Sequence, residues 1–291
     1  MNLIIDVARG FLMGSADVVP GVSGGTVALV LGIYERLVAS VHHAASSLGA
    51  LIRGRWQEAG RRLGAVEWRL LVPLLSGIAL AVLTLSSLID RMLEEQPVET
   101  AALFFGLVLA SILIAWRLVG RWDLGRLVVL AAVAVAAFLL LGLRRGEVAN
   151  PAAAAFFVAG AVAIVAMILP GISGSFILLM LGMYQPVLDA VNDRRLGVIS
   201  VFVAGAAIGL SSFATVLDRL LRHHHDTVMA ALIGLMAGSL RVLWPWPDGT
   251  ATARLAAPQD PLAPLLLAAL GLGVVLGIGW VSRVGGTPRA R

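Results

Sequence analysis

The residues with the clearest chemical potential lie in the stretch ADVVPGVSGGTVALVLGIYE, residues 16–35. Its second half reads as an apolar helix, and its first half sets an acid, a proline, glycines and hydroxyls against that helix. Proline lacks a backbone N–H and glycine permits a sharp turn, so Pro20 and Gly21 predict a break where the helix restarts. The first N–H groups of a helix have no partner within it, and its positive dipole end favours an anion. The pattern therefore predicts an anion site, with phosphate as its natural ligand.

The same pattern occurs a second time in the chain. PGVSGGTVALVLGIY at 20–34 aligns without a gap with PGISGSFILLMLGMY at 170–184, at an offset of 150 residues. Glycines and an Asp-Arg pair in the following segments match at an offset of 128. Two collinear blocks that share such residues favour duplication over chance similarity. We therefore predict two copies of a five-segment unit, residues 1–145 and 150–284, in one transmembrane domain.

Each predicted break offers several hydrogen-bond donors to an anion. Hydroxyls and the N–H groups of the helix start supply the donors, and the glycines let an anion approach the backbone closely. The alternative is a serine N-cap with small residues that allow close helix packing, and the presence of two copies favours the anion site. The predicted phosphate-binding residues are Ser23, Gly24, Gly25, Thr26, Ser173, Gly174, Ser175 and Arg241, and the helix-breaking residues are Pro20, Gly21, Pro170 and Gly171.

Three charged residues near these motifs need separate interpretation. Arg241, which stands beside Trp244, either clamps a phosphate or extends to the headgroup level of the membrane. Asp17, whose counterpart in the second copy is Met167, is either a coupling or gating carboxylate or a cap of the restarting helix. Glu35 is a second coupling or gating candidate, at the cytoplasmic rim.

The composition predicts the environment in which these motifs act. Of 291 residues, 59% are hydrophobic and 13% are charged, whereas soluble domains are about 45–50% apolar and about 25% charged. Several windows approach 20 residues without a charge, the length that crosses a bilayer core. We therefore expect an all-α polytopic membrane protein. The predicted apolar segments are 3–19, 22–41, 66–89, 98–116, 124–143, 151–169, 172–190, 197–217, 227–243 and 262–282.

An odd number of segments in each copy has a geometric consequence. Whether the first two segments of a copy form a re-entrant hairpin or both cross the membrane, the second copy is inverted relative to the first. On this topology 15 of the 22 arginines lie on the side of the N-terminus and 7 on the other. The positive-inside rule then places both termini in the cytoplasm of a multi-pass protein of the cytoplasmic membrane. Inverted repeats are typical of secondary transporters, which alternate access around a midplane site.

The composition also argues against several other functions. The chain has no cysteine and no lysine, which excludes disulfides, thiolate metal sites and the lysine-containing phosphate loop of ATPases. Its arginines lie between apolar segments, where they set topology rather than bind nucleic acid. The histidine runs at 42–43 and 223–225 lack metal-site spacing and predict a solvated turn. No acid–base or nucleophile set stands out, so we expect neither an enzyme, such as a lipid phosphatase, nor a cofactor.

These motifs resemble those of a bacterial and archaeal membrane family that was long catalogued only as a domain of unknown function. The resemblance rests on GSADVVPGVSGGTVALVLGIYE, LPGISGSFILLMLGMY and GLMAGSLRVLWPW, in that order, and spans nearly the whole chain. The family is that of polyprenyl-phosphate transporters. The resemblance implies a flippase that returns undecaprenyl phosphate from the outer to the inner leaflet for reuse in cell-wall biogenesis.

Two questions stay open at the level of the sequence. The residues alone also fit a transporter or channel for a water-soluble anion. A lateral opening between helices would favour the lipid, and a water-filled path would favour the soluble anion. The sequence fixes neither the coupling ion, for which the proton is one candidate, nor the oligomeric state, for which a homo-oligomer is one candidate.

Overall fold

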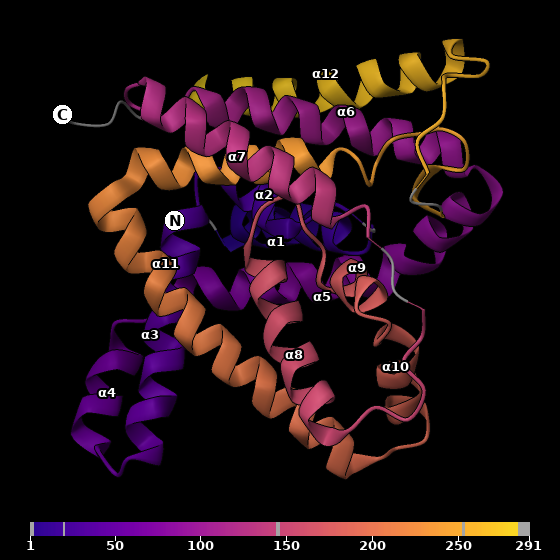
Figure 1. Cartoon of the computed structure of the whole chain (residues 1–291). Coiled ribbons are helices and arrows are strands. Elements are labelled where there is room, and N and C mark those ends of the chain that lie inside the picture. The colour runs from indigo at the N-terminus through magenta and orange to yellow at the C-terminus, as the bar shows by residue number, and fades with distance from the viewer. Residues whose placement is uncertain (1–2, 20, 144–145, 252–253, 285–291) are drawn as a thin grey trace.

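The computed structural model describes residues 3–19, 21–143, 146–251 and 254–284, and the regular structure of these residues is helical throughout (Figure 1). The elements in chain order are α1 (Leu3–Asp17), α2 (Gly24–Val30), α3 (Tyr34–Ile52), α4 (Trp56–Gly64), α5 (Trp68–Glu95), α6 (Pro97–Trp116), α7 (Leu124–Leu140), α8 (Ala153–Ile168), α9 (Gly174–Met180), α10 (Tyr184–Asn192), α11 (Leu196–Ser239), the short 3₁₀ helix η1 (Gly249–Ala251) and α12 (Leu262–Val284).

Within the described residues, four helices are long and apolar enough to cross a membrane, namely α5, α6, α11 and α12. The pair α9 and α10 passes the same test together and is bent by 111° at its break, so it would be a fifth span if it crosses as one unit. Helices α7 and α8 are apolar but shorter. The prediction of an all-helical protein with several membrane-spanning helices is confirmed.

The helix boundaries differ from the predicted segments at three places. Segments 22–41 and 172–190 each divide into two helices, because Gly32 and Gly182 adopt φ angles of +69° and +68°, which residues with a side chain rarely adopt. The predicted eighth and ninth segments correspond to the two parts of α11, which meet at a kink where His224 leaves helical geometry (φ −136°, ψ 41°). The polar stretch before α5 forms the end of α3 and the amphipathic α4, which together project from the helical body (Figure 1).

Helix contacts recur in the two halves of the chain. Helix α1 packs along α5, and α8 packs along the first part of α11. A side chain on Gly10 would collide with the Leu74 carbonyl, and one on Gly160 would collide with the Phe202 carbonyl. The two glycines are 150 residues apart in sequence, and the two residues that they contact are 128 apart, the same offsets as in the repeat. Likewise α6 lies along α12, and the last part of α11 lies along α7 (Figure 1). Glycines therefore set close helix approach at matched positions.

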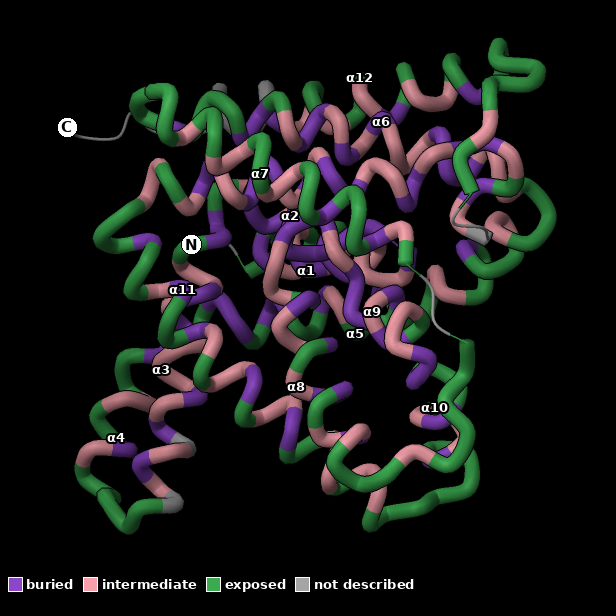
Figure 2. Tube along the Cα trace, in the orientation of Figure 1, coloured by how far each residue is buried: buried purple, intermediate pink, exposed green. Residues whose placement is uncertain are grey.

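The two helix breaks lie in the interior of the protein. Helices α1 and α2 are near the centre of the molecule and carry many buried residues, whereas α4 and α10 lie at its periphery (Figure 2). Among the most deeply buried large side chains are Val19 and Leu29, which flank the first break, and Met236 of α11. Backbone that leaves helical geometry is thus buried in protein, as a break within a membrane protein requires.

Candidate functional site

The first break, between α1 and α2, satisfies its own helix start. Gly21 has a φ of +86° and a Cβ at that position would lie 2.8 Å from a Val242 methyl carbon. Ser23 is the N-cap of α2 and its Oγ accepts a hydrogen bond from the Gly25 N–H at 3.1 Å. The Gly24 N–H donates to Asp17 Oδ1 at 2.6 Å. The chain's own carboxylate thus occupies a helix start that could bind an anion.

The second break, between α8 and α9, has a similar backbone and a different set of hydrogen bonds. Gly171 has a φ of +88°, and Ser173 is the N-cap of α9. Its side chain makes no cap hydrogen bond, and its Oγ instead lies 2.7 Å from Ser175 Oγ. Ser173 is buried and Ser175 is exposed. The second break therefore presents two linked hydroxyls in place of a capped serine.

Asp17 and Met167 occupy equivalent places beside the two helix starts. A Cβ on Gly24 would lie 2.6 Å from Asp17 Oδ2, and a Cβ on Gly174 would lie 2.7 Å from Met167 Cγ. Both glycines are needed because a neighbouring side chain lies directly against the backbone. Of the two sequence interpretations of Asp17, the cap is the one seen in the structure, and a cap can also act as a gate.

The two breaks are joined to each other by hydrogen bonds. Each bond links the first half of the chain to the segment that surrounds the second break, and all involve buried side chains of the first half. The bonds are Ser23 Oγ to the Met167 carbonyl (3.3 Å), the Gly171 N–H to Thr26 Oγ1 (2.8 Å) and Tyr34 OH to the Ile168 carbonyl (3.1 Å). These bonds therefore hold Ser23 and Thr26 of the first break against the segment that precedes Ser173.

A cavity of about 120 Å³ lies beside Asp17. Gly24 and Gly25 line it from the start of α2, and Tyr34 and Met167 line it from α3 and α8. The remaining lining residues are apolar or small. The cavity brings the half-buried carboxylate, two glycine backbones and a tyrosine together, so it is the place where an anion would reach the α2 helix start.

Arg241 lines a different cavity, of about 370 Å³. Its guanidinium carbon stands 4.6 Å from the centre of the Phe138 ring, a cation–π contact, and Phe105 and Trp244 line the same cavity. The residues that line this cavity are not those that line the cavity beside Asp17.

Glu35 takes part in a network that the sequence did not predict. Its Oε1 lies 3.0 Å from His225 Nε2, and His225 Nδ1 lies 3.2 Å from Asp226 Oδ1. Asp226 accepts hydrogen bonds from the Gly120 and Arg121 N–H groups, at 3.0 and 3.1 Å. The network ties α3 to the bend of α11 and to the connection between α6 and α7. The histidines are thus more than a solvated turn, and the Asp that follows them was the available signal.

The remaining predicted residues are placed as follows. Pro170 is buried directly before Gly171, and Pro20 lies outside the described residues. Tyr34 was missed as a site residue, although its repetition as Tyr184 was a visible signal. Among the residues that the structure describes, no group of three or more His, Cys, Asp or Glu side chains could hold a metal ion.

Comparison with known proteins places this architecture in a family. Residues 13–261 match the family described as VCA0040-like, undecaprenyl phosphate translocase-like. A protein of Vibrio cholerae named polyprenyl-phosphate transporter is 40% identical over 250 residues, which cover 85% of this chain and 80% of that protein. A protein of Staphylococcus aureus with the same name is 29% identical over 259 residues, covering 83% and 86%. No solved structure matches the chain.

These relatives are named as transporters and not as enzymes. The matched region contains both helix breaks, Asp17, Tyr34 and Arg241. The chain belongs to the undecaprenyl phosphate translocase-like family.

Proposed function

We propose that this protein is a polyprenyl-phosphate translocase that moves undecaprenyl phosphate from the outer to the inner leaflet of the cytoplasmic membrane, for reuse in cell-wall glycan synthesis. The observation that carries the proposal is the pair of buried, hydrogen-bonded helix breaks, whose glycines and hydroxyls suit a phosphate. The names of the two relatives support the substrate. The arginine distribution supports cytoplasmic termini.

Transport in this proposal uses two inverted repeats, residues 1–145 and 150–284. Supporting observations are the recurring contacts of α1 with α5 and α8 with α11, and the matched φ angles of Gly21 and Gly171. Rocking of one copy against the other would expose the site to each leaflet in turn. Whether each broken hairpin is re-entrant or spans the membrane does not alter this scheme.

The phosphate in this proposal binds at the helix starts of α2 and α9. It displaces the Asp17 carboxylate from the Gly24 N–H and is held by backbone donors and by the hydroxyls of Ser23, Thr26, Ser173 and Ser175. Because the helix start binds either carboxylate or phosphate, Asp17 acts as a gate that recloses the site after release. A carboxylate that is displaced in each cycle is also the natural acceptor for a coupling proton. Arg241, in its separate cavity, is an auxiliary phosphate site on the transport path.

Glu35 has a supporting role in the same scheme. Its contact with His225 holds α3, which carries Tyr34, against the bend of α11. A bend between two apolar helices is a place where a hinge motion can occur. We assign Glu35 to the gate for this reason.

The test is a leaflet assay in proteoliposomes, which follows undecaprenyl phosphate with and without a pH gradient. We expect the double variant Ser23→Ala with Ser173→Ala to lower the transfer rate at least tenfold, since alanine removes two donors without adding bulk to buried positions. Ser76→Ala is the matched control, because Ser76 is exposed on α5 and bonds only the carbonyl of its own helix. Transfer at the wild-type rate in the double variant would contradict the phosphate site.

The second candidate function is transport of a water-soluble anion through the same site. The same proteoliposomes, loaded with a phosphate reporter, measure inorganic phosphate uptake. Uptake without lipid transfer would favour this alternative. The apolar surroundings of the Asp17 cavity favour the lipid instead.

A further inference from the structure

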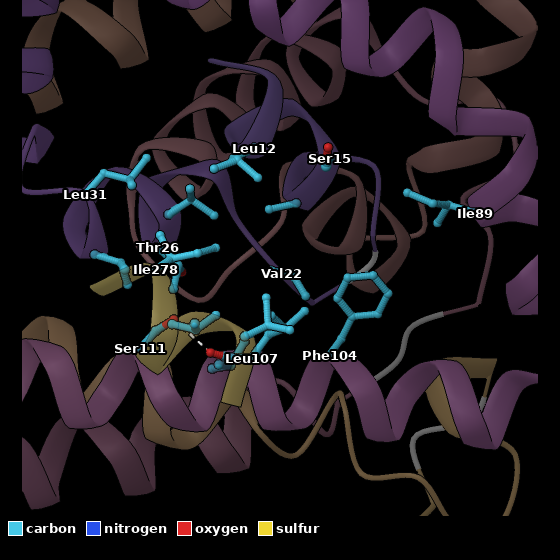
Figure 3. A pocket seen from close by; sticks show the side chains of 16 residues that line it. Leu12, Ser15, Val22, Thr26, Leu31, Ile89, Phe104, Leu107, Ser111 and Ile278 are labelled. Carbon is cyan, nitrogen blue, oxygen red and sulfur yellow. Dashed lines mark hydrogen bonds between the residues drawn. The ribbon is translucent and has the colours of Figure 1, made fainter. Parts of the chain in front are cut away.

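An apolar cavity of about 190 Å³ lies against the other face of α2, between α1, α6 and α12 (Figure 3). Its lining is apolar except for three hydroxyls, and each hydroxyl is already bonded. Ser15 donates to the Phe11 carbonyl and Ser111 to the Leu107 carbonyl, at 2.7 and 2.8 Å, whereas Thr26 accepts from the Gly171 N–H. The cavity therefore suits an apolar ligand and offers little to a polar one.

The second half of the chain fills the corresponding space with its own side chains. At four positions matched by the offset of 150, the residue of the first half is smaller than its counterpart. The pairs are Val22 and Ile172, Thr26 and Phe176, Val27 and Ile177, and Val30 and Met180. Phe176 is buried and packs in one cluster with Ala137 and Leu141 at the C-terminal end of α7, together with the other three large residues. The first half keeps open a space that the second half closes.

The cavity reaches the lipid-facing surface and the start of α2. Leu12 and Val274, which both line it, are 38% and 48% exposed, and Val274 lies on the membrane-spanning α12. Figure 3 shows Leu12, Val22 and Thr26 around the same space. Helix α2 thus separates two cavities, because Gly24 and Gly25 line the one beside Asp17 whereas Val22 and Thr26 line the apolar one.

We propose that this cavity binds the isoprene units next to the phosphate of a polyprenyl phosphate, while the rest of the chain stays in lipid. The inference rests on the proposed function, and it adds a site for the tail. An apolar cavity of about 150 Å³ holds one benzene molecule, so 190 Å³ accommodates between one and two five-carbon units. Val22 directly precedes Ser23, the N-cap of α2, so a ligand whose phosphate is held at this helix start would pass around the N-terminal end of α2 and place these units along Val22, Thr26 and Val27.

The test compares two ligands of the purified protein in nanodiscs: geranyl phosphate, which has two isoprene units, and inorganic phosphate, which has none. We expect geranyl phosphate to bind at least tenfold more tightly than inorganic phosphate, since each methylene group that is buried raises the binding constant about fourfold. Val275→Trp, which fills the cavity from α12, is expected to remove this advantage and to leave inorganic phosphate binding unchanged. Leu270→Trp is the matched control on the same helix, because Leu270 is 57% exposed and does not line the cavity.

A second variant keeps the test decisive if Val275→Trp does not fold. Val22→Ile, Val27→Ile and Val30→Met together copy the second-half residues onto α2, and the same loss of the geranyl advantage is expected. An unchanged advantage in the folded variants, or equal binding of n-decyl phosphate in the wild type, would overturn the isoprenoid site while phosphate binding and lipid transfer still supported the proposed function. Failure of the wild type to bind either ligand or to transfer lipid would overturn both.

Discussion

Gly21 and Gly171, at the two helix breaks, adopt φ angles of +86° and +88°, and Gly32 and Gly182, in the turns that follow α2 and α9, adopt +69° and +68°. The backbone is therefore repeated to within a few degrees, yet the side chains around it are not. Asp17 accepts the first N–H of α2, whereas its counterpart beside α9 is a methionine. Ser23 caps its helix, whereas Ser173 bonds another hydroxyl.

This comparison distinguishes the repeated backbone of the two breaks from the side chains that differ between them. Glycines with positive φ and close helix contacts build two equivalent breaks, so duplication alone accounts for the shape. The first break carries a carboxylate, a tyrosine bonded across the halves and an adjoining apolar cavity, whereas at the matched positions the second break has Met167, an exposed Tyr184 and the larger Phe176. We infer that the first break gates and binds the lipid, and that the second supplies additional donors. Substitutions that exchange residues between the breaks can test this assignment.

Asp17→Met makes the first break resemble the second and is expected to have the largest effect. Met167 shows that a methionine fits beside this kind of helix start. Loss of a hydrogen bond to a charged group changes an equilibrium constant by a factor of roughly 10 to 100. We expect lipid transfer in proteoliposomes to fall by that factor, and inorganic phosphate to bind more tightly because no carboxylate competes for the Gly24 N–H.

The control for this exchange is Met167→Leu, which keeps an apolar side chain beside α9 and is expected to transfer lipid at close to the wild-type rate. Wild-type transfer by Asp17→Met would show that the carboxylate is dispensable and that the two breaks are chemically equivalent. Loss of the pH-gradient dependence in Asp17→Met would assign proton coupling to this residue.

Gly25→Ala tests the close contact between the breaks. A Cβ at Gly25 would lie 2.8 Å from the Ile168 carbonyl oxygen, so the two segments would have to separate. We expect the free energy of unfolding to fall by about 2 kcal/mol, as for an overpacked core, in a thermal or denaturant unfolding measurement. Ser175→Ala at the matched position is the control and is expected to change stability by less than about 0.5 kcal/mol, because Ser175 is exposed. If Gly25→Ala and Ser175→Ala lowered the free energy of unfolding equally, the first break would not be more tightly packed than the second.

Much of the fold follows from the sequence, because uncharged windows and arginine clusters mark the helix ends. The predicted segments 98–116 and 124–143 agree with α6 and α7 to within a few residues. The turn between α2 and α3 and its counterpart between α9 and α10 were not predicted, although Gly32 and Gly182 stand at matched positions. A lone glycine inside an apolar segment does not reveal whether its φ is positive, which depends on packing around it.

Less of the candidate site could be predicted. The sequence indicated which residues surround each break, but not that Asp17 and Met167 both lie against a glycine seven residues further along the chain. Contacts such as Tyr34 with the Ile168 carbonyl join residues 134 apart, and sequence spacing carries no information on such pairs. The sequence left Arg241 as either a phosphate clamp or a residue that extends to the headgroup level, and its cation–π contact with Phe138 of α7 could not be predicted from sequence spacing.

Tyr34→Phe tests one of the hydrogen bonds that join the breaks, and its expected effect is smaller. The buried hydroxyl donates to the Ile168 carbonyl, whereas Tyr184 is 38% exposed. Removing one such bond lowers the free energy of unfolding by about 1 kcal/mol. Tyr184→Phe is expected to change it by a few tenths at most. A larger loss in Tyr184→Phe than in Tyr34→Phe would reverse the order that we assign to the two breaks.

Glu35→Gln makes the rim of the first break resemble the second. It is expected to have the smallest effect, because the side chain of Glu35 is largely exposed. Glu35 is 63% exposed and contacts His225 on α11, whereas its counterpart Gln185 donates to Asp189 within its own helix. An exposed pair contributes about 0–1 kcal/mol and is screened by salt. Glutamine retains a hydrogen-bond acceptor for His225, so we expect no resolvable change in unfolding temperature and at most a threefold slower lipid transfer, with the difference vanishing at high salt. Asp226 accepts hydrogen bonds from two backbone N–H groups and also contacts His225 and Arg126 beside the bend. We therefore expect Asp226→Asn to slow transfer more than Glu35→Gln. If Glu35→Gln abolished transfer instead, the gate would lie at the rim, and the Asp17 carboxylate would be only a cap.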